Sequence, residues 1–315
     1  MSAISKNINI VALICTHNRS SLLMQAIDSI NKAIYPKNCR IEIIIIVNAC
    51  NDNTLELLDN YKNTDSLIPL TYIIEPRPGK SLALNCGINS ISDAFICFID
   101  DDQKVNELYF NECVNAINKF NNIPILCGRL LPDWTGDEPD WIHNNEYKIY
   151  PFPIPVFDLG ENPKKIKLGM ELPPGGQVII HSSIFEKFGN FSESLGPTGH
   201  NLMGSEDTDF FERVLRNGGT IQYVPEIIQY HFVDNDRFRL LYLLKKCFQR
   251  NRSITISRPH LYSTAPFYLA TILARNMFRA TFSTNSLKTR FYLMRSCSTL
   301  GEISGAFYLY LKSKK

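Results

Sequence analysis

The chain has 315 residues, of which 44% are hydrophobic and 20% are charged, an ordinary composition for one large globular domain with an appended segment. The formal net charge of +2 gives no overall field that would attract nucleic acid, so we expect no nucleic-acid partner. Nine scattered cysteines form no C-x-x-C pair, which argues against a zinc site or a disulfide framework and favours buried thiols in a reducing compartment.

The amino terminus has an apolar stretch without a basic leader or a small-residue cleavage site, so it does not read as a secretory signal. No window reaches the roughly 18 to 20 uninterrupted apolar residues that span a bilayer. The sequence therefore predicts a cytoplasmic protein.

Buried strands alternate with helices over the first hundred residues. Each apolar run is followed by a polar loop and then by apolar residues at helical spacing. This alternation predicts a doubly wound, largely parallel sheet with right-handed crossovers. The expected elements are strands at 8–15, 42–47, 70–74 and 95–99, and helices at 22–30, 55–61 and 81–91.

The fourth of these strands ends in three consecutive carboxylates, Asp100, Asp101 and Asp102. An open α/β fold places its ligand crevice at the carboxyl ends of such strands. Like charges packed there need a cation, and hard divalent ions such as Mg²⁺ or Mn²⁺ take oxygen ligands beside a nucleotide diphosphate. A solvated acidic turn that starts the next helix is the alternative, because Asp also favours turns and helix starts.

The sequence after residue 127 is less regular than the first part of the chain. Residues 128–176 contain eight prolines and both tryptophans, which predicts an irregular, ligand-binding excursion over the sheet edge. A strand at 177–180, a helical turn at 182–188, a flexible glycine-rich loop at 196–204, a helix at 210–217 and a last strand at 220–224 are expected to follow.

In this order the segments resemble the inverting nucleotide-sugar glycosyltransferases of family 2, which have the GT-A fold. The resemblance covers roughly residues 8–250, and residues 128–160 look like a subgroup that builds bacterial surface polysaccharides. The matching residues lie at 16–19, 48–54, 79–87, 98–102, 175–177 and 206–207.

The resemblance implies an α/β architecture of the GT-A type, with a doubly wound, mostly parallel sheet and flanking helices, and the composition of the last eighty or so residues adds a C-terminal helical segment. It implies a catalytic domain at 1–236, made of a nucleotide-binding part at 1–127 and an acceptor and sugar part at 128–236. The helical segment would then occupy 237–315.

The resemblance also assigns roles to single residues. Asp102 would be the main ligand of a Mn²⁺ or Mg²⁺ ion, and Asp100 a ribose or metal contact. Apart from the resemblance, the place of His231 at the end of the last strand would suit a further metal or phosphate contact, although a lone histidine there is more often structural. Such a metal would stabilise the leaving nucleoside diphosphate. The residues implied in nucleotide or donor binding are Thr16, Asn18, Arg19, Asn48, Lys80, Asn85, Asp100, Asp101 and Gln177.

Asp207 resembles the general base of the family, and the adjacent Glu206 is the second candidate. An inverting transfer needs one carboxylate that takes a proton from the acceptor hydroxyl, on the face opposite the leaving group. Both acids could instead complement the positive N-terminus of the helix that follows, which is a purely structural use.

The nucleotide base stays open at this point. Val47 stands where the family commonly has a base-contacting aspartate, with Asn48 next to it. A UDP-sugar is the expected donor, with GDP- and dTDP-sugars as alternatives. The expected acceptor is a glycan, on its own or linked to a polyprenyl diphosphate.

Residues 237–315 combine apolar and aromatic runs with many Lys and Arg residues. Such helices suit the inner face of a membrane, where cations meet anionic headgroups. A helical subdomain packed on the catalytic core or on a second copy in a homo-oligomer is equally compatible with the periodicity.

Two other functions compete with glycosyl transfer. A nucleotidyltransferase also uses paired carboxylates on an α/β sheet, but the loop at 16–19 lacks the glycine-rich character that it needs. A non-catalytic carbohydrate- or nucleotide-binding module would use Trp134 and Trp141 to stack on sugars.

Overall fold

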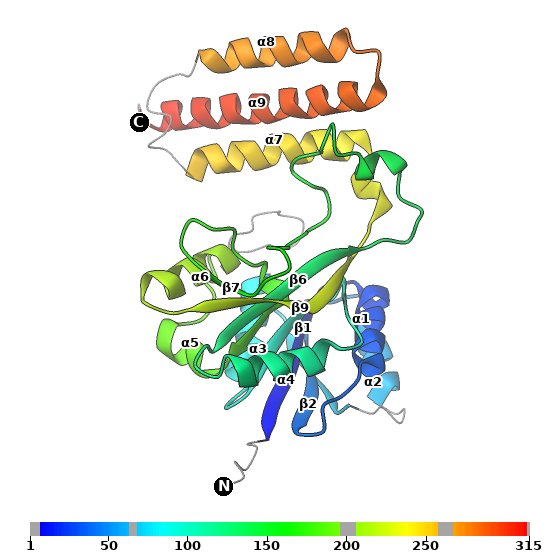
Figure 1. Ribbon diagram of the computed structural model, residues 1–315, viewed down its shortest axis with the longest axis vertical. Coiled ribbons are helices and arrows are strands. Elements are labelled where there is room, and N and C mark those ends of the chain that lie inside the picture. The colour runs from blue at the N-terminus through cyan, green and yellow to red at the C-terminus, as the bar shows by residue number, and fades with distance from the viewer. Residues whose placement is uncertain (1–6, 63–67, 196–205, 258–266, 314–315) are drawn as a thin grey trace. The chain divides into compact units, whose positions relative to one another are not determined.

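The computed structural model describes residues 7–62, 68–195, 206–257 and 267–313 (Figure 1). The chain forms two compact units. One, here called the sheet unit, consists of residues 1–133 and 156–232, and the other, the helical unit, consists of residues 134–155 and 233–315. The division of the chain into two separate domains, 1–236 and 237–315, remains a prediction.

Four parallel strands form the first half of the sheet, as the sequence predicts. The isoleucine- and valine-rich runs of β1, β2 and β4 are buried on both faces, which is the pattern of central parallel strands, whereas the edge strand β3 is partly exposed. Helices connect them and cover the two faces. The elements are β1 (Ile8–Thr16), α1 (Ser20–Lys32), β2 (Cys39–Asn48), α2 (Thr54–Lys62), β3 (Leu70–Glu75), α3 (Lys80–Asn89) and β4 (Phe95–Asp100).

The second half of the sheet is mixed. The strand order is β3-β2-β1-β4-β8-β6-β9-β5, with β7 paired to β9, and β8 runs antiparallel to β4. The predicted α/β sheet, mostly parallel and flanked by helices, is thereby confirmed. The elements are β5 (Gln103–Val105), α4 (Tyr109–Lys119), β6 (Ile125–Asp133), β7 (Lys164–Ile166), η2 (Gly175–Gln177), β8 (Val178–His181), α5 (Ser183–Phe188), α6 (Glu206–Arg216) and β9 (Ile221–Phe232).

Two of the expected elements are wrong in extent. Residues 128–133 are not part of an irregular excursion but continue β6 inside the sheet, and the last strand runs on through Pro225 to Phe232. Both segments contain a proline, yet they pair with each other across about a hundred residues of sequence, and this long-range pairing overrides the local signal. The loop expected at 196–204 lies outside the described residues.

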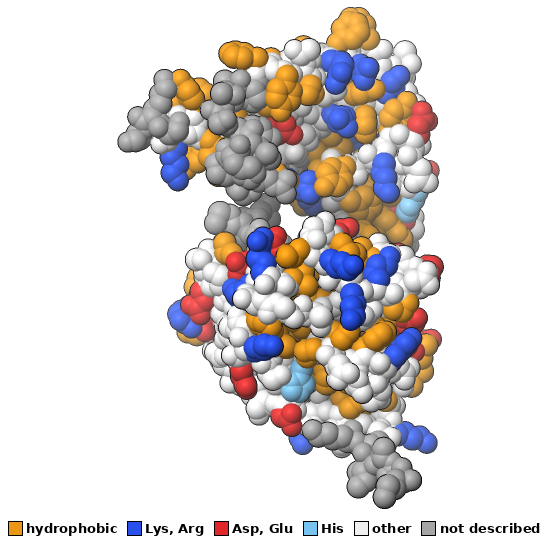
Figure 2. All heavy atoms as spheres, turned by 60° about the vertical axis from the view of Figure 1, so that its left-hand side comes forward, with side chains coloured by type: hydrophobic (Ala, Val, Ile, Leu, Met, Phe, Trp, Pro, Cys, Tyr) orange, Lys and Arg blue, Asp and Glu red, His pale blue; other side chains and the backbone are white. Residues whose placement is uncertain are grey.

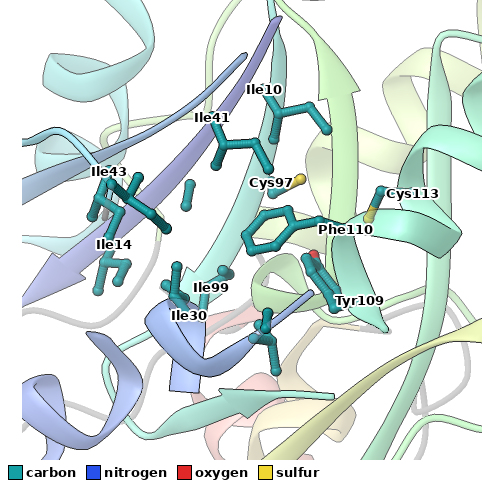
Figure 3. Packing of buried hydrophobic residues seen from close by; sticks show 14 of the residues in the cluster. Ile10, Ile14, Ile30, Ile41, Ile43, Cys97, Ile99, Tyr109, Phe110 and Cys113 are labelled. Atoms are coloured by element: carbon teal, nitrogen blue, oxygen red, sulfur yellow. The ribbon is translucent and has the colours of Figure 1, made fainter. Parts of the chain in front are cut away.

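The core of the sheet unit has two layers, one on each face of the sheet. Successive residues of β1 alternate between them, with Ile10 and Ile14 on one face and Val11 and Leu13 on the other. Figure 3 shows the first layer, where Phe110 of α4 lies among the isoleucines of the strands. This double burial fixes the strands in register and so fixes where each one ends.

The helical unit is a layer of three helices with α9 between α7 and α8 (Figure 1). Its elements are η1 (Asp140–His143), η3 (Asn235–Phe238), α7 (Leu240–Ser257), α8 (Tyr268–Thr281) and α9 (Ser286–Ser313). A Cβ added at Gly301 would lie 2.3 Å from the carbonyl oxygen of Phe248, so α7 and α9 approach closely at that glycine. None of the described helices has the length and apolar character to cross a membrane.

Both tryptophans belong to this unit. The Trp134 ring contacts His143, Phe152 and Phe238, and Arg290 lies 3.8 Å from the centre of the Trp141 ring. The two rings therefore pack within the helical unit. All nine cysteines are described, and each is a free thiol.

Candidate functional site

Four strands of the sheet unit end in polar residues at one edge of the sheet. Thr16 ends β1, Asn48 ends β2, Glu75 ends β3 and Asp100 ends β4. The parallel registers align these ends, since Cys15 pairs with Asp100 and Asn48 pairs with Glu75. The sheet thus delivers chemically active side chains to the carboxyl edge where open α/β folds bind ligands.

Asp101 is held by the loop after β1. Thr16 Oγ1 donates to its Oδ2 at 2.9 Å, and Arg19 Nη1 donates to its Oδ1 at 3.0 Å. The same Arg19 nitrogen lies 3.2 Å from Asp102 Oδ2. Burial and the neighbouring Asp102 raise the pKa of Asp101 to about 6, although Arg19 and Thr16 oppose this.

Asp100 has a different cation. Lys80 Nζ, at the start of α3, donates to its Oδ1 at 2.8 Å. Burial alone would raise the pKa of Asp100, but Lys80 holds it below the ordinary value, and burial of Lys80 is likewise outweighed by Asp100, so the lysine pKa is raised. The structure therefore divides the three carboxylates between two cations, Arg19 and Lys80.

Two successive glycines lie between Asp100 and Asp207. The Gly175 amide donates to Asp207 Oδ2 at 3.1 Å, and a Cβ on Gly176 would lie 2.4 Å from Asp100 Oδ2. Bare backbone at both positions lets the end of β4 and the start of α6 approach the same short segment. The acids of 100–102 and of 206–207, a hundred residues apart, are thus brought to one site.

Asp207 and Glu206 occupy the first turn of α6, yet their environments differ. The Thr208 amide donates to Asp207 Oδ1 at 2.7 Å, so both carboxylate oxygens are oriented by backbone amides. Glu206 is buried, and its Oε2 has no hydrogen-bond partner among the described residues. Burial raises the pKa of Glu206; the charge of Lys80 opposes this shift, and that of Asp207 adds to it.

Asp102 faces His231 from across the sheet. The Nδ1 atom of His231 lies 2.8 Å from the carbonyl oxygen of Phe232, and because a carbonyl only accepts, this nitrogen must carry a proton. The other ring nitrogen, Nε2, lies 3.5 Å from Asp102 Oδ2. Nε2 can therefore face the carboxylate either with a lone pair, which a divalent cation between the two groups would satisfy, or with a second N–H that donates to Asp102.

The donor set fits Mn²⁺ or Mg²⁺ in chemical type. Carboxylate and imidazole both bind Mn²⁺, and a nucleotide-bound Mg²⁺ or Mn²⁺ commonly has only one or two protein ligands because phosphate oxygens supply others. In the described part of the chain, no three His, Cys, Asp or Glu side chains are arranged as a complete metal site. Asp102, which Arg19 also contacts, and His231 are the pair that would hold the ion, while Asp100 makes the shorter ion pair with Lys80.

Three predicted donor ligands make contacts to backbone instead. Asn48 Nδ2 donates to the carbonyl oxygens of Glu75 and Arg77, and Asn48 Oδ1 accepts from the Gly79 amide, so this side chain ties β2 to the loop before α3. Asn85 pairs with both backbone groups of Phe191, and Gln177 Nε2 donates to the carbonyl oxygen of Arg129. These residues position the site, and their roles as donor ligands stay predictions.

Asn18 has a similar local role. Its backbone has a φ of 54°, a left-handed conformation that asparagine tolerates better than most residues, and its Oδ1 accepts from the Asn51 amide at 2.7 Å. It joins the loop after β1 to the loop after β2. The two loops thereby form one wall of the site.

The sequence did not single out Gln103 or Glu75. Gln103 is buried, its Oε1 accepts from the Asp100 amide at 3.0 Å, and it pairs with His231 across the sheet. Glu75 makes a two-pronged ion pair with Arg77, which lowers the pKa of Glu75 to about 2. Gln103 lies between Asp102 and Lys104 in a polar stretch, so the local sequence offered no signal that it would be buried in a strand.

Comparison with known proteins gives a consistent result. Residues 11–187 match the family described as Glycosyl transferase family 2. The succinoglycan biosynthesis protein ExoM of Rhizobium meliloti is 24% identical over 241 residues, which are 76% of this chain and 72% of that protein. An uncharacterized glycosyltransferase of Rickettsia prowazekii, RP339, is 26% identical over 58% of this chain and 53% of its own length.

Solved structures of similar fold are more distant in sequence. TarS 1-349 of S. aureus, in complex with UDP-GlcNAc, has a TM-score of 0.55 at 14% identity and covers 96% of this chain and 92% of its own. The mannosyltransferase PcManGT of Pyrobaculum calidifontis, in complex with GDP-Man and Mn²⁺, has a TM-score of 0.57 at 15% identity, with 97% and 88% covered. At such identities the likeness concerns the fold.

Proposed function

Because the chain belongs to glycosyl transferase family 2, we propose that the carboxyl edge of its sheet unit binds a nucleoside-diphosphate sugar and transfers the sugar with inversion. The predicted GT-A fold is confirmed, and the chain is a nucleotide-sugar glycosyltransferase. The nucleotidyltransferase and the binding module are therefore set aside. The observation that carries the proposal is the convergence of Asp100 and Asp207 on the segment 175–176, at the edge of the sheet where Asp102 follows the end of β4.

We assign the diphosphate to the side of the site that holds Arg19, Lys80 and Asp102. A Mn²⁺ or Mg²⁺ ion bound to Asp102 and His231 would act as a Lewis acid that stabilises the leaving diphosphate. The similar structure of PcManGT, which binds GDP-Man and Mn²⁺, supports a divalent ion in this fold. Lys80 is already positioned by Asp100 and would supply a fixed positive charge to phosphate oxygens.

Asp207 is the proposed general base. Its two oxygens accept from the amides of Gly175 and Thr208, which fixes the carboxylate in place while leaving lone pairs for an acceptor hydroxyl. Glu206 suits this role less well, because burial favours its protonated form. A single displacement at the anomeric carbon then needs no covalent intermediate on the enzyme.

For the acceptor, we propose a growing bacterial surface glycan carried on a lipid diphosphate, at the inner face of the cell membrane. ExoM, named for succinoglycan biosynthesis, supports a polysaccharide product. The basic and aromatic helical unit supports a membrane location. The donor base stays open among uracil, guanine and thymine, and the similar structures hold both UDP-GlcNAc and GDP-Man.

The first test is the melting temperature of the protein with UDP, GDP, dTDP and CDP, each with and without Mn²⁺ or Mg²⁺. A ligand that binds only the folded state raises this temperature. We expect one nucleotide to stabilise the protein, and the stabilisation to require the metal and disappear in Asp102→Asn. If no nucleotide raises the melting temperature with either metal, the proposed donor site is wrong.

A further inference from the structure

Charge is distributed very unevenly along this nearly neutral chain. Residues 237–315 contain fifteen Lys and Arg residues and one acidic residue, Glu302. Residues 1–236 contain 18 basic and 30 acidic residues. The small net charge of +2 therefore conceals a strongly positive segment joined to a negative one, and charge asymmetry of this kind points to an anionic partner for the positive segment.

The same segment exposes most of the large apolar side chains. Of the nineteen large hydrophobic residues that are exposed in the described part of the chain, ten lie between Phe267 and Leu311. Exposed apolar residues are ordinary when scattered, but a concentration of them on one element marks an interaction surface. At the top of Figure 2, hydrophobic and basic side chains of the helical unit lie side by side, and few acidic ones are visible.

The surface is best defined on α8. This helix lies at the edge of the three-helix layer, and it packs on α9 through Leu269, Asn276 and Ala280. At 100° per residue, Phe278, which is 63% exposed, lies on the opposite side of the helix, and the residues that cap its two ends, Phe267 and Phe282, continue that side and are 86% and 70% exposed. The rings of Phe278 and Phe282 contact each other, with centres 4.5 Å apart.

Cations lie beside this aromatic stripe. Arg275 is exposed on the same side of the helix, and Arg279 lies next to it with its guanidinium 5.5 Å from the centre of the Tyr292 ring. The apolar surface continues at the end of α9 with Phe307 and Leu311, and Figure 1 shows the end of α9 beside the start of α8. Aromatic rings flanked by cations on the outer side of a helix are the arrangement of a helix that lies in a membrane interface.

We propose that the face of α8 formed by Phe267, Phe278, Phe282 and Arg275 docks on the surface of an anionic lipid bilayer. The proposal rests on the membrane location proposed for the acceptor, and it names the surface and the lipid charge. A second copy of the helical unit would bring two strongly positive surfaces together, which like charges oppose. A nucleic acid would pair with the cations but would leave the row of three phenylalanines in water.

The expected binding has two separable components. Partial insertion of two phenylalanine rings into the interface should account for about a tenfold or larger factor in the partition coefficient. One arginine near an anionic surface should account for about a fivefold factor that weakens with salt. Substitutions of exposed residues in the sheet unit should change neither component of the binding.

The experiment is flotation of the full-length protein with two kinds of vesicle. One kind is phosphatidylcholine alone, and the other also contains about 30% phosphatidylglycerol, which gives a strong negative surface potential. We expect binding to the anionic vesicles only. The double variant Phe278→Ser with Phe282→Ser should lose about tenfold or more in partitioning, and Arg275→Gln about fivefold. Leu241→Ser removes a side chain of the same unit that is 81% exposed on α7, and Arg216→Gln removes an exposed cation of α6; both controls should bind as the wild type does.

Melting temperatures and light scattering accompany the flotation. Unchanged melting of the double variant would show that lost binding is not lost folding. Equal binding to both vesicle types, undiminished binding of the double variant, or binding of a short RNA duplex in place of vesicles would each overturn the proposal. So would a wild-type dimer that the double variant abolishes while neither protein binds vesicles.

The nucleotide experiment separates this inference from the proposed transfer. Vesicle binding by a protein that no nucleotide stabilises would support the α8 surface and contradict the donor site. Nucleotide stabilisation of a protein that ignores anionic vesicles would overturn the α8 surface and leave the donor site intact.

Discussion

The sheet unit and the helical unit use charge in opposite ways. At the carboxyl edge of the sheet, each acid of the 100–102 run lies beside a cation, with Asp101 near Arg19 and Asp100 near Lys80. In the helical unit, residues 237–315 carry fifteen cations and one carboxylate, and only Arg237 and Arg239 pair with the acids just before them, Asp234 and Asp236, among the described ion pairs of this segment. Compensated charges hold a small ligand in one geometry, whereas an excess of one sign on an exposed apolar helix suits an extended surface.

The largest effect is expected from Asp207→Asn. The amide keeps the shape of the side chain but cannot accept the acceptor's proton, so transfer should fall by about 10²- to 10⁴-fold. Nucleotide stabilisation should be retained because Asp207 does not contact the proposed diphosphate side. The measurement is transfer from a nucleotide sugar, with Asp209→Asn on the same helix as the control, and near-normal transfer in Asp207→Asn would exclude it as the base.

Asp102→Asn should weaken metal-dependent nucleotide binding by about tenfold or more, since it removes the charge that would hold the ion beside His231. Titration calorimetry with Mn²⁺ and the stabilising nucleotide measures this directly. Asp28→Asn removes an exposed carboxylate of the same unit, paired only with Lys32, and should change nothing. Equal losses in the two variants would point to a general electrostatic effect.

Gly301→Ala tests the packing of the helical unit. Helix propensity alone favours alanine by about 1 kcal/mol, but the new Cβ would lie 2.3 Å from the carbonyl oxygen of Phe248. Overpacking should win, with a net loss of about 1–3 kcal/mol in the free energy of unfolding, measured by urea denaturation. Ser304→Ala on the same helix should be within about 0.5 kcal/mol of the wild type.

The smallest expected effect is a change in how steeply the free energy of unfolding varies with pH. Burial and the charges of Arg237 and Arg250 lower the pKa of Lys246 from 10.5 to about 8. Between these values the unfolded chain binds the proton that the folded chain has lost, so this lysine makes stability rise with pH over that window. Its contribution cannot exceed about 1.4 kcal/mol per pH unit. Lys246→Met should remove it from unfolding curves measured between pH 8 and 10, and an unchanged slope would contradict the burial of this charge.

The part of the fold that could be predicted is the part that local sequence patterns determine. The strands β1 to β4 are short apolar runs, each followed along the chain by a helix, and the carboxylates at 100–102 lie at the carboxyl end of β4, as expected. β6 and β9 could not be predicted in full because each is stabilised by the other, and both carry a proline that locally argues against a strand. Their pairing depends on contacts that no local pattern contains.

The site shows the same division. Residue type predicted that acids and cations would gather at the site, but not which partner each side chain would bind. Asn48 is an example: its amide is the kind of group that binds a nucleotide base, yet its hydrogen bonds go to Glu75, Arg77 and Gly79. Gln103 is the converse, a residue of unremarkable type that the register of β5 with β9 sets beside Asp100 and His231.

Gly175 and Gly176 have a consequence for how this enzyme can diversify. With Asp100 on one side of them and Asp207 on the other, they make the separation between these two carboxylates a property of the main chain, and in the proposed reaction this separation spans the site from the diphosphate side to the attacking hydroxyl. Loops around the edge can then change to admit another sugar or another acceptor without resetting that separation. Substitution at either glycine would instead change the distance between the two carboxylates. Changes of specificity should therefore be sought in the surrounding loops and not at these two glycines.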